Sequence, residues 1–179
     1  MQETGTRINK YMSQCGYCSR READRLIEKG EVWINGTLAT MGTKVMPGDT
    51  VMVHHTTITP CQKEYLLAFH KPAGIVCTTS KIDKNNIIDY LNFPERIYPV
   101  GRLDKESTGL LLLTNNGQLM DDILRGSNYH EKEYIVHVNK PITDSVLQAM
   151  AQGVPILDTI TRPCKIRRMG KDCFYITLT

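Results

Sequence analysis

The sequence contains no long run of apolar residues. No stretch of its 179 residues approaches the ~18 apolar residues that a membrane-spanning helix needs. Residues 1–10 are polar, so they lack the apolar centre of a secretory signal peptide. Because both features are missing, we expect a soluble cytoplasmic protein that has no membrane partner.

The sequence also lacks a second pair of closely spaced cysteines. Cys15 and Cys18 form a C-x-x-C motif, but a zinc site of this kind needs a second pair, and a redox motif needs a preceding thioredoxin-like strand. The other four cysteines are scattered: Cys61, Cys77, Cys164 and Cys173. We therefore expect six free thiols in a reducing compartment, several of them in the core, and no metal site.

A strong net charge is absent as well. The 22 basic and 19 acidic residues give a formal charge of +3, which permits a nucleic-acid partner without requiring one. Hydrophobic content of 41% and charged content of 23% are typical of a globular protein. The chain is long enough for one or two domains with a real core.

The most distinctive stretch is GRLDKESTGLLLLTNNG, at residues 101–117. A charged loop closed by Gly109 leads into four leucines, and this short bounded apolar run predicts a buried strand. Asp104 lies between Arg102 and Lys105, where positive charge favours an ionised carboxylate. Such a carboxylate suits nucleophilic or general-base chemistry on an anionic polymer, although a solvated turn between strands would have the same composition.

The first 55 residues contain signals for two short helices. Apolar residues at helical spacing predict a helix over residues 6–13. Ser19 followed by Glu22 predicts the N-cap and capping box of a second helix, which we expect to end near Lys29. This part of the chain is expected to be a compact α+β module.

Short strands and turns complete this module. The Asn35-Gly36 turn between two short apolar runs predicts a hairpin over residues 32–39, and residues 50–53 predict a further strand. Residues 56–63 include a proline and show little apolar periodicity, so we expect them to form a linker.

Basic side chains are concentrated in the two predicted helices. They are Arg7, Lys10, Arg20, Arg21, Arg25 and Lys29. Clustered arginines and lysines can neutralise the backbone phosphates of a nucleic acid. A solvated helix face balanced by Glu22, Asp24 and Glu28 would give the same pattern, so charge alone leaves both interpretations open.

The remaining residues predict a second set of short elements. Strands are expected over residues 65–70, 75–79, 110–113, 134–138, 161–168 and 173–178, and helices over residues 85–91, 118–125 and 145–152.

The stretch at residues 101–117 resembles the signature of the pseudouridine synthases, specifically the small bacterial ribosomal-RNA branch called the RsuA/RluF type. The resemblance implies that Asp104 is the catalytic carboxylate, acting at the ribose or as a nucleophile. It implies that Arg102 assists extrusion of the base and pairs with Asp104. It also implies an α+β fold, in which an S4-type module precedes a mixed, mainly antiparallel sheet with flanking helices. No cofactor is expected, because pseudouridine formation involves no net oxidation.

Residues 7–39, RINKYMSQCGYCSRREADRLIEKGEVWINGTLA, are similar to the S4 RNA-binding domain. The similarity covers nearly the whole first module. It implies RNA contacts by Arg7, Lys10, Ser19, Arg20, Arg21 and Lys29. Such contacts position structured RNA rather than read its sequence.

Two further motifs match the same family. The K-P-x-G turn contains Lys71, which the resemblance places in the active-site wall, although a plain hairpin turn accounts for the same residues. The K-x-Y motif contains Lys132 and Tyr134, and the resemblance implies that Tyr134 stacks on the extruded uracil. A strand residue with its ring half in the core is the alternative for Tyr134. Lys71, Lys105 and Lys132 are added to the predicted RNA contacts.

The resemblance predicts an S4 domain at residues 1–55, a linker at 56–63 and a catalytic domain at 64–179. The synthases continue into an R-Q-x-R-R-M box, whereas this sequence ends at Thr179, so we expect the catalytic domain to be incomplete at its C-terminus. The segment IRRM at residues 166–169 resembles that box only superficially.

The sequence thus predicts a monomeric synthase that converts a uridine of ribosomal RNA to pseudouridine. The segment HEKEY at residues 130–134 resembles the large-subunit member of F type, which implies a 23S stem-loop as the target. The alternatives are a non-catalytic S4-type RNA-binding protein and an inactive synthase fragment. A purely structural ribosome-associated factor is disfavoured by the preserved GRLD motif.

Overall fold

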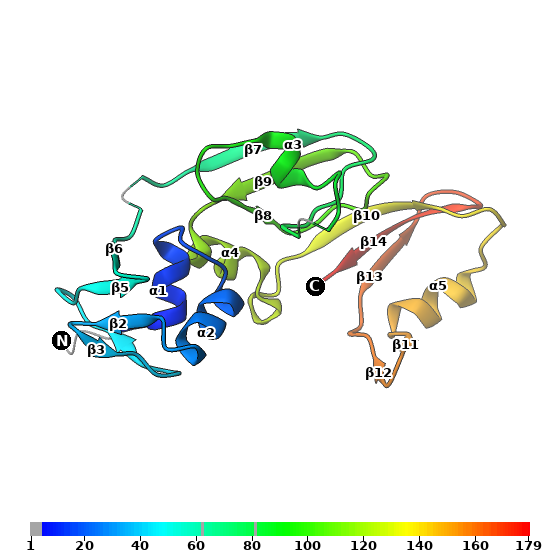
Figure 1. Ribbon diagram of the computed structural model, residues 1–179. Coiled ribbons are helices and arrows are strands. Elements are labelled where there is room, and N and C mark those ends of the chain that lie inside the picture. The colour runs from blue at the N-terminus through cyan, green and yellow to red at the C-terminus, as the bar shows by residue number, and fades with distance from the viewer. Residues whose placement is uncertain (1–4, 62, 81) are drawn as a thin grey trace. The chain divides into compact units, whose positions relative to one another are not determined.

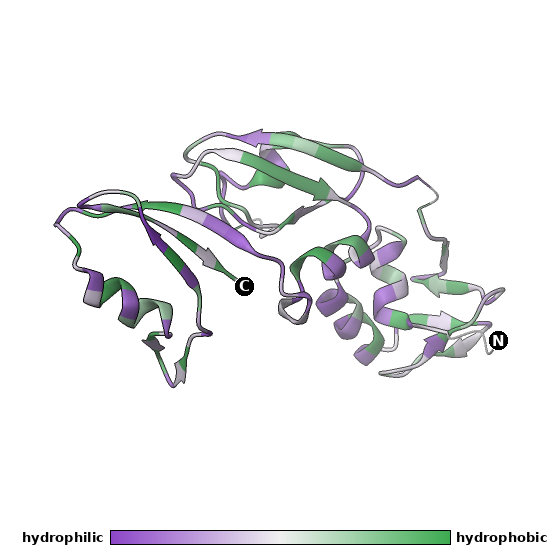
Figure 2. Ribbon diagram, turned by 180° about the vertical axis from the view of Figure 1, so that it is seen from behind, coloured by the Kyte–Doolittle hydropathy of each residue, from purple (hydrophilic) through white to green (hydrophobic). Residues whose placement is uncertain are grey.

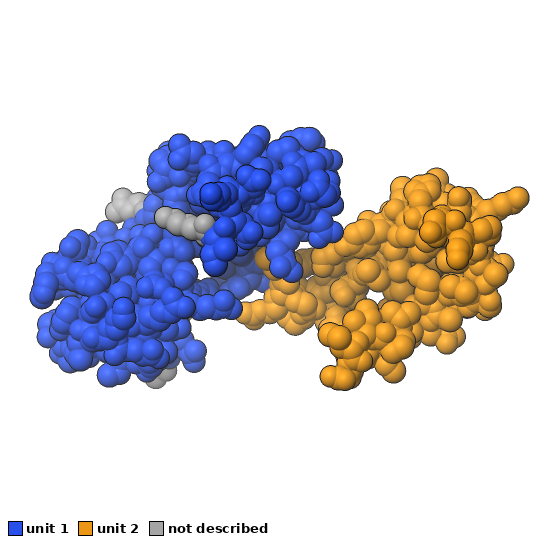
Figure 3. Space-filling view, turned by 45° about the vertical axis from the view of Figure 1, so that its right-hand side comes forward, with its two compact units in different colours: residues 1–121 blue, residues 122–179 orange. Residues whose placement is uncertain are grey.

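The computed structural model describes residues 5–61, 63–80 and 82–179. The chain divides into two compact units, residues 1–121 and residues 122–179 (Figure 3). Residues 1–4 of the predicted S4 domain and Gln62 of the predicted linker lie outside the described residues. Across the described ranges, no helix has both the length and the apolar character needed to span a membrane.

The N-terminal part of the first unit combines two helices with a small sheet (Figure 1). The helices are α1 (Ile8–Gln14) and α2 (Arg20–Glu28). The sheet has the order β3-β2-β5-β6, with β3 at Thr37–Leu38, β2 at Val32–Ile34, β5 at Val51–Val53 and β6 at Thr56–Ile58. A separate antiparallel pair joins β1 (Thr6–Arg7) to β4 (Lys44–Val45). The predicted α+β module is confirmed.

Local sequence signals explain these elements. The Ser19 hydroxyl accepts a hydrogen bond from the Glu22 backbone N–H at 3.1 Å, which is the N-cap interaction predicted for α2. Asn35 and Gly36 have φ angles of 49° and 79°, as a two-residue hairpin turn requires. The helices and the sheet share one apolar core, which includes Ile8, Met12, Ala23, Leu26, Ile27, Val32, Val51 and Val53.

The predicted linker contributes a strand to this sheet. Residues 56–58 form β6, which pairs antiparallel with β5, and Ile58 is buried opposite Val51. His54 and His55, both with positive φ, make the connecting turn. The sequence did not reveal β6 because only one of its residues, Ile58, contributes to the core.

The rest of the first unit is built on a three-stranded antiparallel sheet of order β7-β9-β8. The strands are β7 (Leu66–Lys71), β9 (Gly109–Thr114) and β8 (Tyr98–Val100). Figure 2 shows the hydrophobic character of β7 and β9. The leucine run is a strand as predicted, but it is buried on one face only: Leu111 and Leu113 are in the core, whereas Leu110 is 67% exposed.

Two helices accompany this sheet. Helix α3 (Ile87–Leu91) begins at Asn86, whose side chain accepts a hydrogen bond from the Asp89 N–H. Helix α4 (Gly117–Leu124) follows β9 and spans the division between the two units. The strand predicted over residues 75–79 does not form; Val76 makes only an isolated bridge to Asn86.

The second unit has a three-stranded antiparallel sheet of order β10-β14-β13. The strands are β10 (Lys132–His137), β14 (Cys173–Leu178) and β13 (Lys165–Arg168). Helix α5 (Asp144–Ala151) contacts β13, and the Arg168 guanidinium forms an ion pair with Asp144 at 2.7 Å. A short 3₁₀ helix η1 (Gly126–Asn128) precedes β10, and β11 (Pro155–Ile156) pairs with β12 (Thr159–Ile160).

Candidate active site and RNA-binding surface

Asp104 lies in the loop between β8 and β9. Gly101, with φ of 85°, turns the chain out of β8 in a conformation that favours glycine. The loop borders a pocket of about 420 Å³, which is lined by Val76, Cys77, Thr78, Arg102, Leu103, Asp104 and Lys105. Asp104 is exposed at this pocket. The carboxylate is therefore accessible to a substrate while its backbone is carried by two paired strands.

Lys71 fixes this loop from the end of β7. Its side chain has no exposed surface, and its ammonium donates hydrogen bonds to the carbonyls of Pro72 (2.8 Å), Lys105 (3.0 Å) and Ser107 (2.8 Å). Two of these acceptors, Lys105 and Ser107, follow Asp104 in the loop, so the buried ammonium ties the segment just after Asp104 to β7. The prediction that Lys71 contacts RNA is wrong, because no part of it is accessible.

Backbone contacts complete the attachment of the loop. The Gly74 N–H donates to the Lys105 carbonyl at 2.8 Å, and the Leu103 N–H donates to the Cys77 sulfur at 3.4 Å. Leu103 also packs against the apolar core beneath the sheet. The K-P-x-G turn thus has a structural role: together with Cys77, which lines the pocket, it holds the main chain on both sides of Asp104.

Arg102 and Lys105 place positive charge on either side of Asp104. Both side chains are exposed and line the same pocket. The predicted pairing of Arg102 with Asp104 is not present: the ion pairs found among the described residues do not include one between these two side chains. The guanidinium is therefore available to a phosphate or a base.

Tyr134 and Lys132 lie on β10, in the second unit. Tyr134 is 46% exposed and stands opposite Ile176 in the register of β10 with β14. Lys132 is two residues away, so both side chains are on the same face of the sheet. This partial burial agrees equally well with both roles considered for Tyr134: stacking on the uracil, and a strand residue whose ring lies half in the core.

The predicted RNA contacts of the first module lie around its helices. Arg7 is exposed just before α1, Arg20 and Arg21 are exposed at the start of α2, and Lys29 is exposed at its end. A helix N-terminus carrying two arginines favours phosphate binding. Ser19 serves this helix as its N-cap, which is a role independent of RNA.

Two of these basic residues also contact α4. Lys10 donates to the Gln118 side chain at 3.4 Å, and Arg20 lies 3.8 Å from the Asp121 carboxylate. Both contacts are exposed and therefore weak. They leave the positive charge of these side chains largely accessible.

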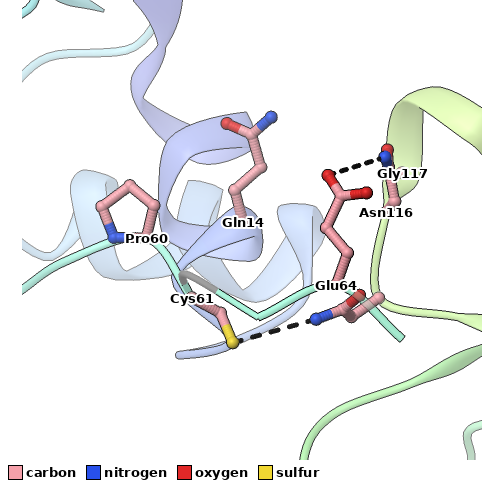
Figure 4. A pocket seen from close by; sticks show the side chains of 7 residues that line it. Gln14, Pro60, Cys61, Glu64, Asn116 and Gly117 are labelled. Atoms are coloured by element: carbon pink, nitrogen blue, oxygen red, sulfur yellow. Dashed lines mark hydrogen bonds between the residues drawn. The ribbon is translucent and has the colours of Figure 1, made fainter.

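A separate polar pocket of about 200 Å³ lies beside these helices (Figure 4). Asn116 donates to the Glu64 carboxylate at 3.1 Å, and Asn115 approaches the Cys61 sulfur at 3.8 Å. Gln14 and Pro60 also line it. Its polar groups are largely paired with one another, so it resembles a structural junction more than a binding site.

Within the part of the chain that the structure describes, neither a metal cluster nor a disulfide marks another site. No group of His, Cys, Asp or Glu side chains within the described ranges is arranged to hold a metal ion. All six cysteines are free, as predicted, and Cys18, Cys77 and Cys173 are buried.

Comparison with known families matches both parts of the chain. Residues 6–51 match the S4 domain, and residues 65–166 match the RNA pseudouridylate synthase family. The chain belongs to the RNA pseudouridine synthase family. The synthase match includes Asp104, its loop and the K-x-Y motif on β10.

Several relatives support this assignment. The dual-specificity RNA pseudouridine synthase RluF of Escherichia coli (strain K12) is 50% identical over 98% of this chain and 61% of its own length. The ribosomal large subunit pseudouridine synthase B of Bacillus subtilis (strain 168) is 32% identical over 93% of this chain and 69% of its own. The chain therefore spans about three fifths of the RluF relatives.

A solved pseudouridylate synthase has a related structure. It aligns with a TM-score of 0.59 at 26% identity, covering 97% of this chain and 76% of the other. This agreement confirms the predicted α+β fold with an S4 module and a synthase module.

Proposed function

We propose that the protein converts a uridine of ribosomal RNA to pseudouridine, with Asp104 as the catalytic carboxylate. The observation that carries the proposal is the placement of Asp104 at a pocket of about 420 Å³, on a loop held by the buried Lys71 ammonium. A fixed, accessible carboxylate between two cationic side chains suits work on a polyanionic substrate. Membership of the synthase family supports the same chemistry.

The reaction rearranges bonds without changing oxidation state. The bond from ribose C1′ to uracil N1 breaks, the base turns, and C1′ bonds to C5 instead. The hydrogen on C5 leaves as a proton, and N1 takes up a proton. No electron acceptor is required, so the protein's contribution is a carboxylate, a place for the turned base and control of the RNA backbone.

Complementary roles would fall to two further side chains at the pocket, Arg102 and Lys105, and to two on β10 of the second unit, Tyr134 and Lys132. Arg102 would hold the backbone or the vacated base position while the uridine is extruded, because its guanidinium is exposed and unpaired with Asp104. Tyr134 would stack on the uracil, since aromatic stacking holds extruded bases. Lys105 and Lys132 would contact neighbouring phosphates.

The first module would bind structured RNA through its basic residues. These are Arg7, Lys10, Arg20, Arg21 and Lys29. Ser19 lies beside Arg20 and Arg21 at the N-terminus of α2. We assign the S4 RNA-binding role to the first module, which β6 extends from the predicted residue 55 to residue 58, and the catalytic role to residues 64–179. The S4 match at residues 6–51 supports this role.

A large-subunit rRNA stem-loop is the substrate we favour. A relative at 32% identity is named a ribosomal large subunit synthase, and the RluF relatives are named dual-specificity RNA synthases. The protein would act as a cytoplasmic monomer on 23S rRNA.

The test compares the unaltered chain with Asp104→Asn on unmodified large-subunit rRNA. We expect pseudouridine, measured by nucleoside chromatography and mass spectrometry, only with the unaltered chain. Both proteins should bind the rRNA with similar affinity, because asparagine removes one charge and keeps the size. Binding without isomerisation by the unaltered chain would favour a non-catalytic S4-type RNA-binding protein. Isomerisation by Asp104→Asn at the normal rate would contradict the role of Asp104.

A further inference from the structure

In the second unit, Tyr129 and Arg162 form an exposed cation–π pair. The Arg162 guanidinium carbon lies 4.5 Å from the centroid of the Tyr129 ring. Tyr129 is 60% exposed, and Arg162 is also exposed. One flank of the ring therefore holds a cation, while much of the rest of the side chain is open to solvent.

Both partners have fixed backbones. Tyr129 ends the 3₁₀ helix η1 with φ of 52° and ψ of 34°, a left-handed conformation that side chains other than glycine rarely adopt. The Asn128 side chain holds this loop by donating to the Asp122 carbonyl at 2.6 Å. On the other side, the Thr161 N–H donates to the Val154 carbonyl at 2.9 Å, which anchors the residue just before Arg162.

The pair is not explained by packing. Tyr129 does not belong to a buried cluster, and within the described ranges its hydroxyl has no hydrogen-bond partner. A second pair of the same type, Arg167 over Tyr175 at 4.1 Å, is different because it lies across two strands and its tyrosine is half-buried. The Tyr129 ring is therefore exposed, set by a defined backbone conformation, and available to stack on a ligand.

The Arg162 guanidinium favours an anionic ligand. Arg162 uses one guanidinium N–H to bond the Gly126 carbonyl at 3.4 Å, and its other N–H groups have no hydrogen-bond acceptor within the described ranges. Arg125 and Lys132 lie on the adjoining segment of chain. The nearby Glu131 carboxylate is bound to Lys165 at 2.7 Å, so its charge is largely offset.

We propose that Tyr129 and Arg162 form a binding site for one unpaired nucleotide of the RNA substrate, outside the uridine that reacts. The base would stack on the open side of the Tyr129 ring, and the free N–H groups of Arg162 would bind the adjoining phosphate. This site rests on the proposed function, because it requires an RNA substrate. It adds a contact with single-stranded RNA, whereas the helices of the first module contact structured RNA.

The test uses the full 179-residue chain and two RNA probes. One is a fluorescent hairpin with an unpaired uridine-rich loop, and the other is the same strand annealed to its complement. Affinities are measured by anisotropy over a range of salt concentrations for the unaltered chain, Tyr129→Leu and Arg162→Gln. Tyr90→Leu is the matched control, because Tyr90 is a similarly exposed tyrosine (55%) on α3.

The two variants should lose different parts of the interaction. Tyr129→Leu should weaken hairpin binding roughly tenfold at every salt concentration, with little effect on the duplex. Arg162→Gln should reduce the slope of log affinity against log salt by about 0.7, the contribution of one single-strand phosphate. Tyr90→Leu should change neither quantity. Tyr129→Trp should restore binding, which separates stacking from any effect of Tyr129→Leu on folding.

Normal hairpin binding by both variants would overturn the proposed site, as would an equal loss on hairpin and duplex or failure of Tyr129→Trp to restore binding. Tritium release from 5-³H-uridine rRNA is measured on the same preparations. If the unaltered chain binds the hairpin but releases no tritium, the proposed function fails separately from this site.

Discussion

The ammonium of Lys71 donates a hydrogen bond to the carbonyl of Lys105, 34 residues away in the sequence, at 3.0 Å. A second bond reaches the Ser107 carbonyl at 2.8 Å. A cation with no exposed surface is therefore satisfied by main-chain oxygens of the segment that follows Asp104. This arrangement makes the position of the proposed catalytic carboxylate depend on a residue that the substrate cannot reach.

Replacing Lys71 by methionine should destabilise the protein and reduce turnover. The variant keeps the length of the side chain but leaves three carbonyls without their donor, at a cost of about 3 kcal/mol. Urea unfolding measures the stability, and pseudouridine formation measures the turnover. Lys105→Met is the control for the stability measurement alone, because Lys105 contributes its carbonyl to the Lys71 ammonium and has an exposed side chain. Equal stability of the Lys71→Met and unaltered proteins would show that these bonds contribute little.

The Ser19 position allows capping and RNA contact to be separated. Ser19→Ala should lower the free energy of unfolding by about 1 kcal/mol, because α2 loses its N-cap. Ser19→Asp should retain the cap and the stability, yet weaken RNA binding, because it places a negative charge where phosphate is expected. If Ser19→Asp binds RNA as tightly as the unaltered chain in anisotropy titrations, Ser19 does not lie near a phosphate.

Alkaline conditions should destabilise the first module. Burial raises the pKa of the Cys15 and Cys18 thiols to about 11 from an ordinary value of 9.0. The unfolded chain therefore loses these protons at a lower pH than the folded chain, so the associated stability is complete below pH 9 and is lost as pH rises towards 11. Between pH 9 and pH 11, the free energy of unfolding should fall as pH rises. The slope of this free energy against pH should be smaller in the double variant Cys15→Ala/Cys18→Ala. Cys61→Ala, which changes an exposed thiol, should leave the slope unaltered.

The ring of Tyr134 should matter more than its hydroxyl. Tyr134→Phe keeps an aromatic face for the extruded uracil and should retain most of the activity. Tyr134→Leu removes that face and should lower kcat/KM roughly tenfold or more. Steady-state kinetics on rRNA distinguish the two variants. Equal rates for Phe and Leu would assign Tyr134 to the strand rather than to the substrate.

Several elements could be predicted because their signals are local. The Ser19 cap, the Asn35-Gly36 turn and the leucine run bounded by glycine each lie within a few residues of the structure that they specify. The position of Asp104 before β9 followed from the same run. The family resemblance supplied its predicted role, which spacing alone left open.

The errors concern features that depend on distant contacts. Lys71 was assigned to RNA, whereas its partners are carbonyls up to 36 residues away. Residues 56–58 form a strand, although only one of them is apolar, because β5 is available to pair with them. The strand predicted over residues 75–79 fails although residues 75–77 are apolar, because Val76 makes only an isolated bridge. Leu110 is exposed because successive side chains of β9 point to opposite faces of the sheet, and the core covers only the face of Leu111 and Leu113.

The most direct test of the account is tritium release from unmodified large-subunit rRNA labelled with 5-³H-uridine. The C5 hydrogen leaves only when C5 bonds to the ribose, so release reports the isomerisation itself. We predict release by the unaltered chain and none by Asp104→Ala, with rRNA binding retained by both. Release at the same rate from the Asp104→Ala variant would contradict the proposal that the Asp104 carboxylate, on the loop that Lys71 holds, performs the reaction.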